Sequence, residues 1–336
     1  MNHLKVTYHS VKLFFHFLME SYVFLKLTLK YNASINTDSD IEKMQYTLLR
    51  ENHTIEKGMS MRNPKKGFGQ QKVINLIKRL DRYADLYLSH DAEFITYPLS
   101  TIKNYIKYTK DSGVNIGHIE ESYRALLEKV GFDDVEGHAG ICKETRNHIL
   151  EECKKDFKSL LYSRHSIRYF SEKIPDIEII EKALQIAQQT PSACNRQGWK
   201  THVFFNEDSI KLIKWQGGCR GFEEEIRCSI LVTANLKAFL SYEVHQAYVD
   251  GGLFAMNLIN ALHYLGLGTI PLSTAFRCKK LRRLNMFGIH ECEIPILIIG
   301  VGNLMEVFNI AASTRKKIIQ TNTFHFNENI NCKSAD

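Results

Sequence analysis

The chain has 336 residues, and 44% of them are hydrophobic, which is enough apolar material to bury a sizeable core. A disordered chain is therefore not expected. The net charge of +7 arises from basic residues that are mostly dispersed along the sequence. Charge alone therefore does not distinguish among a phosphate-bearing ligand, nucleic acid and an anionic membrane surface.

The eight cysteines include no CxxC pair, and no group of Cys and His has the spacing of zinc ligands. We therefore predict no metal site. No secretory signal is recognised, so the thiols are expected to be reduced, which indicates a cytoplasmic protein.

The chain opens with an apolar stretch, VKLFFHFLMESYVFLKLTLK, at 11–30. His16, Glu20 and Lys26 interrupt this stretch before it reaches the roughly 20 clean residues that a membrane span requires. No transmembrane helix is therefore predicted. A helix docked on the rest of the protein is favoured over a helix that lies on a membrane surface.

Residues 1–156 are expected to form a mainly helical extension. The part from 30 to 70 is polar and is expected to be irregular. Apolar residues recur at helical spacing in 70–89, and a second helix is expected at 119–130, with Gly131 as a candidate C-cap.

His53 and Glu56 lie in this extension, three residues apart. In a helix the two side chains would share a face, and a solvated surface is the favoured interpretation. A lid or a substrate site is the alternative.

Alternating helix and strand patterns begin near residue 157. Asp176 is a candidate N-cap for a helix whose apolar residues share one face. The helix expected at 246–266 is apolar nearly all round, so its own sheet or a partner subunit must cover it. Short apolar segments predict core strands at 201–205, 229–234 and 294–301.

The sequence SRHSIRYF at 163–170 is the first motif that indicates chemistry. If this segment is extended, alternate side chains point to opposite sides. Arg164, Ser166 and Arg168 would then face one way, and two guanidiniums flanking a hydroxyl suit a phosphate or a polarised heterocycle. For this motif alone, a solvated charged turn is the alternative.

Four further motifs follow in chain order: TPSACNRQGW at 190–199, GLGTIP at 266–271, GVGN at 300–303 and AASTRKK at 311–317. Together with RHSIR they resemble the FMN-dependent nitroreductase family over 157–317. The resemblance implies an α+β fold with a mixed, largely antiparallel sheet wrapped by helices. It implies an FMN-binding domain at 157–320, which leaves a C-terminal tail at 321–336.

The resemblance also implies which residues bind the cofactor. Arg164 and Ser166 match positions that hold the FMN phosphate or ribityl chain, and Arg168 matches a cation near flavin N1 and O2. Arg315 matches a terminal basic residue that closes on the phosphate. His165 is included among the cofactor-binding candidates, but we do not expect it to act as a general base.

Pro191, Ser192 and Asn195 match a loop that wraps the flavin, which in the family often comes from the opposite subunit. The family commonly has proline where this chain has Gly198, and this difference is expected to loosen the loop.

Pro271, Leu272 and Ser273 match a turn whose backbone lies against the isoalloxazine ring. Arg220 falls in a loop that contacts the pyrimidine edge in the family, and an ordinary surface loop is the equal alternative.

The function implied is an FMN-dependent NAD(P)H oxidoreductase of the nitroreductase type, assembled as a homodimer that shares its flavin sites. Hydride would pass from NADH or NADPH to flavin N5 and then to an unidentified electrophilic acceptor in a ping-pong cycle. No catalytic residue is expected beyond electrostatic support from Arg168, because the flavin carries the chemistry.

The alternative is a flavin-binding module without turnover in polysaccharide assembly. Residues 50–69 resemble N-terminal extensions on nitroreductase-like proteins that are associated with polysaccharide biosynthesis. Nucleic-acid binding is disfavoured, because no recognisable scaffold places basic and aromatic residues together.

Overall fold

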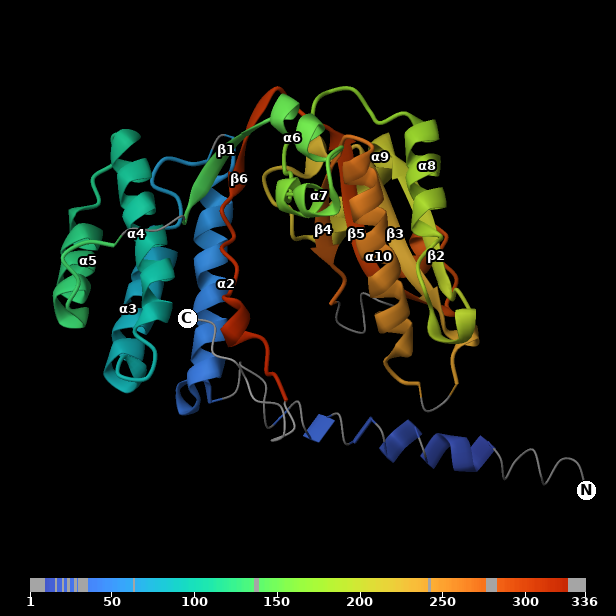
Figure 1. Ribbon diagram of the computed structural model, residues 1–336, viewed down its shortest axis with the longest axis horizontal. Helices are drawn as coiled ribbons and strands as arrows, with labels where there is room; N and C mark the ends of the chain where they lie inside the picture. The colour runs from blue at the N-terminus through green and yellow to red at the C-terminus, as the bar shows by residue number, and fades with distance from the viewer. Residues whose placement is uncertain are drawn as a thin grey trace, which may run out of the picture.

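The computed structural model describes the chain from residue 10 to residue 325 with gaps at 16, 20, 23–24, 27–28, 30–35, 63, 136–138, 241–242 and 276–282. Figure 1 shows two bodies, one helical and one built on a sheet. The antiparallel strands β1 (Ile141–Thr145) and β6 (Val307–Ala311) join them. Segments far apart in sequence therefore lie side by side at the junction.

The helical body contains α2 (Ile41–Met59), α3 (Gln70–Tyr87), α4 (Glu93–Asp111) and α5 (Gly117–Val130), preceded by the short 3-10 helix η1 (Thr37–Ser39). These helices share one apolar core, in which Leu48, Leu76 and Leu99 are fully buried. The two predicted helices are confirmed as α3 and α5. Gly131 ends α5 as a left-handed C-cap with φ of 75°.

The expectation that residues 30–70 are irregular is wrong, because α2 occupies much of that range. The helix buries one face in the core, and charged residues on its other faces obscure the apolar spacing in the sequence. Asp40 caps its N-terminus by accepting a hydrogen bond from the backbone N–H of Lys43 at 3.0 Å. The buried apolar residues of α2 are Met44, Leu48, Ile55 and Met59.

The second body is built on a four-stranded sheet with the order β2-β3-β5-β4, in which each neighbouring pair is antiparallel. Three of the strands confirm the predicted core strands, and they are β2 (Trp199–Phe205), β3 (Cys228–Asn235) and β5 (Glu293–Asn303). The fourth, β4 (Leu267–Ser273), contains residues expected to form a turn, so that expectation is wrong. Pro271 is tolerated there because β4 is an edge strand of this sheet.

Helices cover both faces of the sheet. On β3, Ile230 and Val232 pack in one core cluster with α8 (Ile177–Ala187) and α10 (Gln246–Tyr264), whereas Leu231 packs with α9 (Asn206–Gln216) on the opposite side. This alternation is the period of two that a strand buried on both faces requires. The fold is therefore α+β, with an antiparallel sheet wrapped by helices (Figure 1).

Two short helices, α6 (Arg146–Glu152) and α7 (Phe157–Ser163), connect β1 to the sheet body. Ile149 of α6 lies in the same core cluster as Ile298 of β5. Residues on both sides of position 156 thus pack with the sheet, and the boundary expected there stays a proposal.

The N-terminal stretch does not form the docked helix that we expected. Among the described residues between 10 and 29, the large apolar side chains are exposed, including Phe14 at 62% and Met19 at 59%. Figure 1 shows this segment extending away from both bodies. Within the described part of the chain, no helix is both long and apolar enough to cross a membrane.

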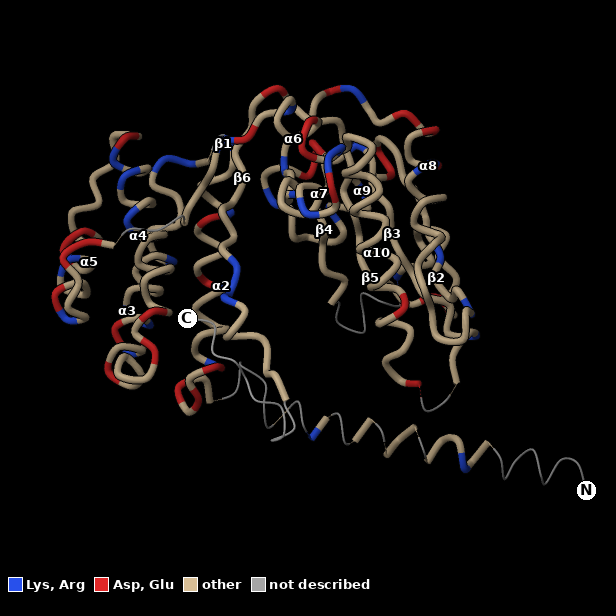
Figure 2. The backbone as a smooth tube through the Cα atoms, viewed as in Figure 1, with Lys and Arg blue, Asp and Glu red and all other residues tan. Residues whose placement is uncertain are grey.

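Charged residues are dispersed in space as well as in sequence. Figure 2 shows Lys and Arg interspersed with Asp and Glu over both bodies. A group of cations therefore indicates a binding site in this protein only where the cations are buried or line the same cavity.

Candidate functional site

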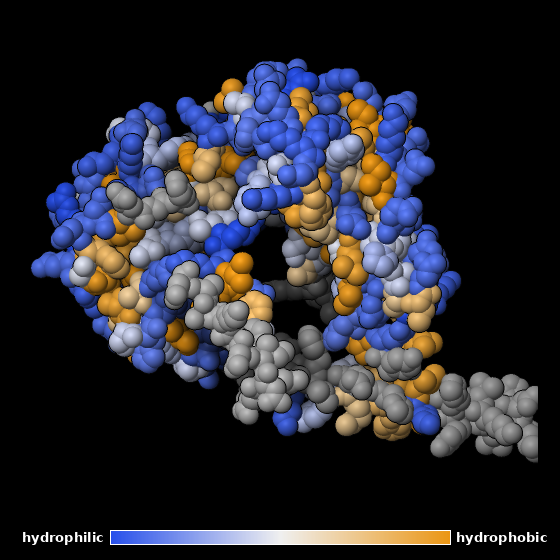
Figure 3. All heavy atoms as spheres, in the orientation of Figure 1, coloured by the Kyte–Doolittle hydropathy of each residue, from blue (hydrophilic) through white to orange (hydrophobic). Residues whose placement is uncertain are grey.

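A cavity of about 560 Å³ lies where the segment 164–168 meets the chain that follows β6. This volume is within the range of about 300–1,000 Å³ that is usual for small-molecule sites. The surface of the protein is also hollowed between the two bodies (Figure 3). The residues that line the cavity are Cys142, Leu161, Tyr162, Arg164, His165, Ser166, Arg168 and Ala311 to Arg315.

The sheet fixes the segment that carries the two arginines. Ser166 forms an isolated parallel bridge with Thr269 of β4, and the N–H of Ile167 donates to the carbonyl oxygen of Thr269 at 2.8 Å. The side chain of Ile167 is buried in the core beside the sheet, which leaves Ser166 on the cavity side. The predicted alternation is present, except that His165 also lines the cavity.

Arg164 and Arg315 share this cavity although they come from opposite ends of the domain. Burial lowers the pKa of the Arg164 guanidinium, and the nearby positive charge of Arg315 lowers it further. Burial also lowers the pKa of His165, against the opposing effect of Glu144, whose Oε2 lies 3.9 Å from the His165 Nε2. Cations that repel one another in a shared cavity are stabilised by a bound anion.

Arg168 is only 5% exposed, which excludes the solvated charged turn as an account of this motif. Its Nη1 donates to the Oγ of Ser60 at 3.2 Å, and its Nε has no hydrogen-bond partner among the described residues. Burial lowers the pKa of Arg168. A buried guanidinium with an unused donor is a group that a ligand atom could satisfy.

A buried Ser–His pair lies close enough to Arg164 and His165 to feel their charge, and sequence reasoning missed it. The Oγ of Ser163 lies 2.9 Å from the Nε2 of His263, and both residues are buried. Burial lowers the pKa of His263 to about 4, with further lowering by Arg164 and His165. The imidazole is therefore neutral at neutral pH. Because His263 lies in the apolar α10 segment, no local sequence motif marked it as a functional residue.

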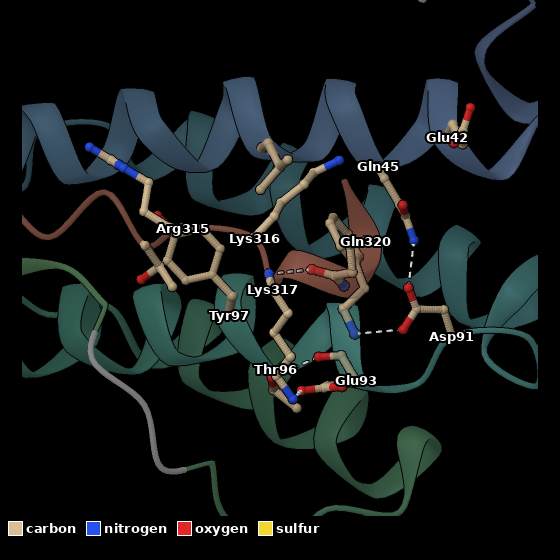
Figure 4. Close-up of a pocket in the computed structure, with 13 residues that line it drawn as sticks. Glu42, Gln45, Asp91, Glu93, Thr96, Tyr97, Arg315, Lys316, Lys317 and Gln320 are labelled. Atoms are coloured by element: carbon tan, nitrogen blue, oxygen red, sulfur yellow. Dashed lines mark hydrogen bonds and ion pairs between the residues drawn. The ribbon is translucent and has the colours of Figure 1, made fainter. Parts of the chain in front are cut away.

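A second cavity, of about 300 Å³, lies between α2, α4 and the C-terminal segment (Figure 4). Several of its polar groups are paired: Lys317 forms an ion pair with Glu93, and the Nε2 of Gln45 donates to the Oδ2 of Asp91 at 3.0 Å. Only the first of these two cavities is lined by buried Arg168, whose Nε is unpaired among the described residues, so the first cavity is the better candidate for a functional site.

Residues 161–244 match the model of the Nitroreductase family. Over this segment the chain is similar to the Nitroreductase family. The match begins in α7 and includes both the RHSIR segment and the PSACN loop.

Two relatives carry the name "Putative NADH dehydrogenase/NAD(P)H nitroreductase". The protein from Archaeoglobus fulgidus is 28% identical over 155 residues, which cover 46% of this chain and 86% of that protein. The protein from Methanothermobacter thermautotrophicus is 28% identical over 156 residues, which cover 44% of this chain and 78% of that protein.

The comparison with solved structures also found similar chains. A "putative nitroreductase in complex with FMN" from Exiguobacterium sibiricum has 17% identity and a TM-score of 0.45, and the match covers 51% of this chain and 98% of that one. A nitroreductase family protein from Streptococcus pneumoniae has 22% identity and a TM-score of 0.44, with 51% and 100% coverage.

The PSACN loop does not line the cavity within one chain. Pro191 and Asn195 are exposed, and Ser192 is partly exposed. The backbone N–H of Ala193 donates to both carboxylate oxygens of buried Asp250 in α10, at 3.2 and 3.3 Å. The loop is therefore held rigidly on α10 while its tip faces outward.

Gly198 does not loosen this loop, and that expectation is wrong. The residue is buried, and a Cβ placed on it would lie 2.9 Å from the Cβ of Ala238 and 2.9 Å from the Cζ of Phe239. Its carbonyl accepts a hydrogen bond from the N–H of Asn235 at 2.7 Å. Glycine is present because two segments approach closely here.

The remaining predicted site residues do not line the cavity. Pro271, Leu272 and Ser273 follow Thr269 in β4, next to Ser166, and the Nε2 of Gln216 donates to the Ser273 carbonyl at 2.9 Å. Arg220 is exposed and does not line the cavity. Among the described residues, no cluster of His, Cys, Asp and Glu could hold a metal ion.

Proposed function

We propose that the nitroreductase domain binds FMN in the Arg164 cavity and acts as an FMN-dependent NAD(P)H oxidoreductase. The observation that carries the proposal is the convergence of Arg164, Ser166, Arg168 and Arg315 on one cavity, with an unpaired Nε on buried Arg168. The cavity volume of about 560 Å³ and the cationic wall fit a small anionic cofactor.

Each residue of the wall has a role that follows from its chemistry. Arg164 and Arg315 carry charge that suits the phosphate, and the hydroxyl of Ser166 offers a further hydrogen bond. Arg168, buried behind them, suits the edge of the ring system that gains electron density on reduction. When bound, FMN would supply hydride transfer between NADH or NADPH and an electrophilic acceptor, in a ping-pong cycle.

The active assembly is proposed to be a homodimer. One face of α10 packs on the sheet, whereas the opposite face exposes apolar side chains, including Tyr248, Val249, Leu253 and Met256 at 41–51%. An apolar helix face of this kind is typical of a subunit interface. The PSACN loop is tied to the same helix through Asp250, so a dimer formed on α10 would carry this loop towards the partner.

The cofactor can be tested directly. The purified full-length chain should contain, or take up on titration, about one FMN per chain, identified by chromatography after denaturation. Flavin in the form of FAD, or no FMN uptake at saturating concentration, would refute the proposal. Bound FMN that NADH and NADPH fail to reduce would instead support the non-catalytic module.

A further inference from the structure

The end of α2 and the residues that follow it contact the sheet body, although α2 belongs to the helical body. The Nζ of Lys57 donates to the carbonyl of Gly218 at 2.5 Å. The guanidinium of Arg62 lies 4.7 Å from the centroid of the Tyr169 ring and 3.7 Å from a carboxylate oxygen of Glu225. The helix end therefore touches both the loop 216–225 and the segment that carries Arg168.

Ser60 connects this helix end to Arg168. Its Oγ donates to the carbonyl of Lys57 at 2.9 Å, so its proton is committed and its lone pairs are free to accept. Arg168 Nη1 donates to that oxygen at 3.2 Å. Because Ser60 is 2% exposed and Arg168 is 5% exposed, water does not compete for this hydrogen bond. The position of the guanidinium thus depends on α2.

Lys57 adds a second positive charge beside Arg168. Burial lowers the pKa of Lys57, and the charge of Arg168 contributes to this lowering. Glu56 and Glu223 influence the two cations from a distance, but within the described ranges neither cation has an ion-pair partner within 4.0 Å. Burial raises the pKa of Cys219, next to both, to about 11, so its thiol is neutral and supplies no counter-charge.

Two partly or fully buried cations without a paired anion are costly unless a ligand supplies negative charge. We infer that the last turn of α2 completes the flavin site, with Ser60 positioning Arg168 and Lys57 raising the positive potential at the electron-rich edge of the flavin. This inference rests on the proposed function. By this inference the helical extension contributes residues to the redox site.

The test compares full-length variants for their affinity for oxidised and dithionite-reduced FMN. Lys57→Met should reduce the preference for reduced FMN about tenfold, because it removes a positive charge beside Arg168. For a two-electron couple, tenfold equals about 30 mV of lowered midpoint potential. Ser60→Ala should also reduce this preference, whereas Ser60→Thr, which keeps the hydroxyl, should retain it.

Two variants separate charge from docking. Lys57→Arg keeps the charge and should retain the wild-type preference. Arg62→Met removes a docking contact of the same helix end but no charge that lies beside Arg168, and it should also retain the preference. An unchanged preference in Lys57→Met, or an equal loss in Arg62→Met, would overturn the inference alone. A wild-type chain that binds no FMN would overturn the proposed function with it.

Discussion

Replacement of buried His263 by glutamine should make the protein less sensitive to acid. His263 has a pKa of about 4 in the folded protein, compared with 6.5 for an exposed histidine. The lowered value means that the unfolded chain binds the proton more readily. His263 therefore contributes stability that is complete above pH 6.5 and is lost progressively as the pH falls towards 4.

The size of this effect follows from the two values. They differ by about 2.5, and each pH unit corresponds to about 1.4 kcal/mol, so the wild-type chain should lose about 3 kcal/mol between pH 6.5 and 4 through this residue. Urea unfolding at several pH values would measure the loss. His263→Gln should flatten the curve in this window, while His118→Gln, at an exposed position on α5, should not. Equal slopes for wild type and His263→Gln would refute the reasoning.

Three other predictions concern cofactor, packing and assembly. Arg168→Ala should lower the midpoint potential of bound FMN, measured by spectroelectrochemistry with FMN at saturation. Arg164→Ala should instead weaken FMN binding by roughly 1.5–3 kcal/mol per lost charge-assisted bond and leave the midpoint potential nearly unchanged. Equal midpoint potentials in the two variants would show that Arg168 does not lie at the flavin edge. Gly198→Ala should lower the free energy of unfolding, measured in urea, by about 1–3 kcal/mol, because the added Cβ would clash with Phe239. An unchanged urea-unfolding midpoint would contradict that packing. Leu253→Asp should give a folded monomer in sedimentation, because Leu253 is 48% exposed on the proposed interface; a variant that stays dimeric would place the interface elsewhere.

The sequence made much of the sheet body predictable. Its strands are short apolar runs, and the structure confirms them as β2, β3 and β5. The alternation of Arg164, Ser166 and Arg168 was also predictable, because it depends only on an extended backbone. The segment at 270–273 was misassigned, because the resemblance implied a turn there, while the pairing of β4 with β5 depends on distant residues.

The contribution of α2 could not be predicted from local patterns. Glu56 was expected on a solvated surface, but it is fully buried, and its Oε1 accepts a hydrogen bond from the N–H of Gly140 at 3.2 Å. The contact between Ser60 and Arg168 joins residues separated by 108 positions. Such contacts follow from how the two bodies pack, which no helical period encodes. The cytoplasmic location and the association with polysaccharide biosynthesis stay predictions.

Anaerobic reduction of the FMN-loaded, full-length chain tests the central claim most directly. On addition of NADH or NADPH the flavin absorbance should bleach, and it should return when an electrophilic acceptor such as a quinone or a nitroaromatic compound is added. Flavin that binds but is bleached by neither nucleotide, or a chain that takes up no FMN, would contradict the account.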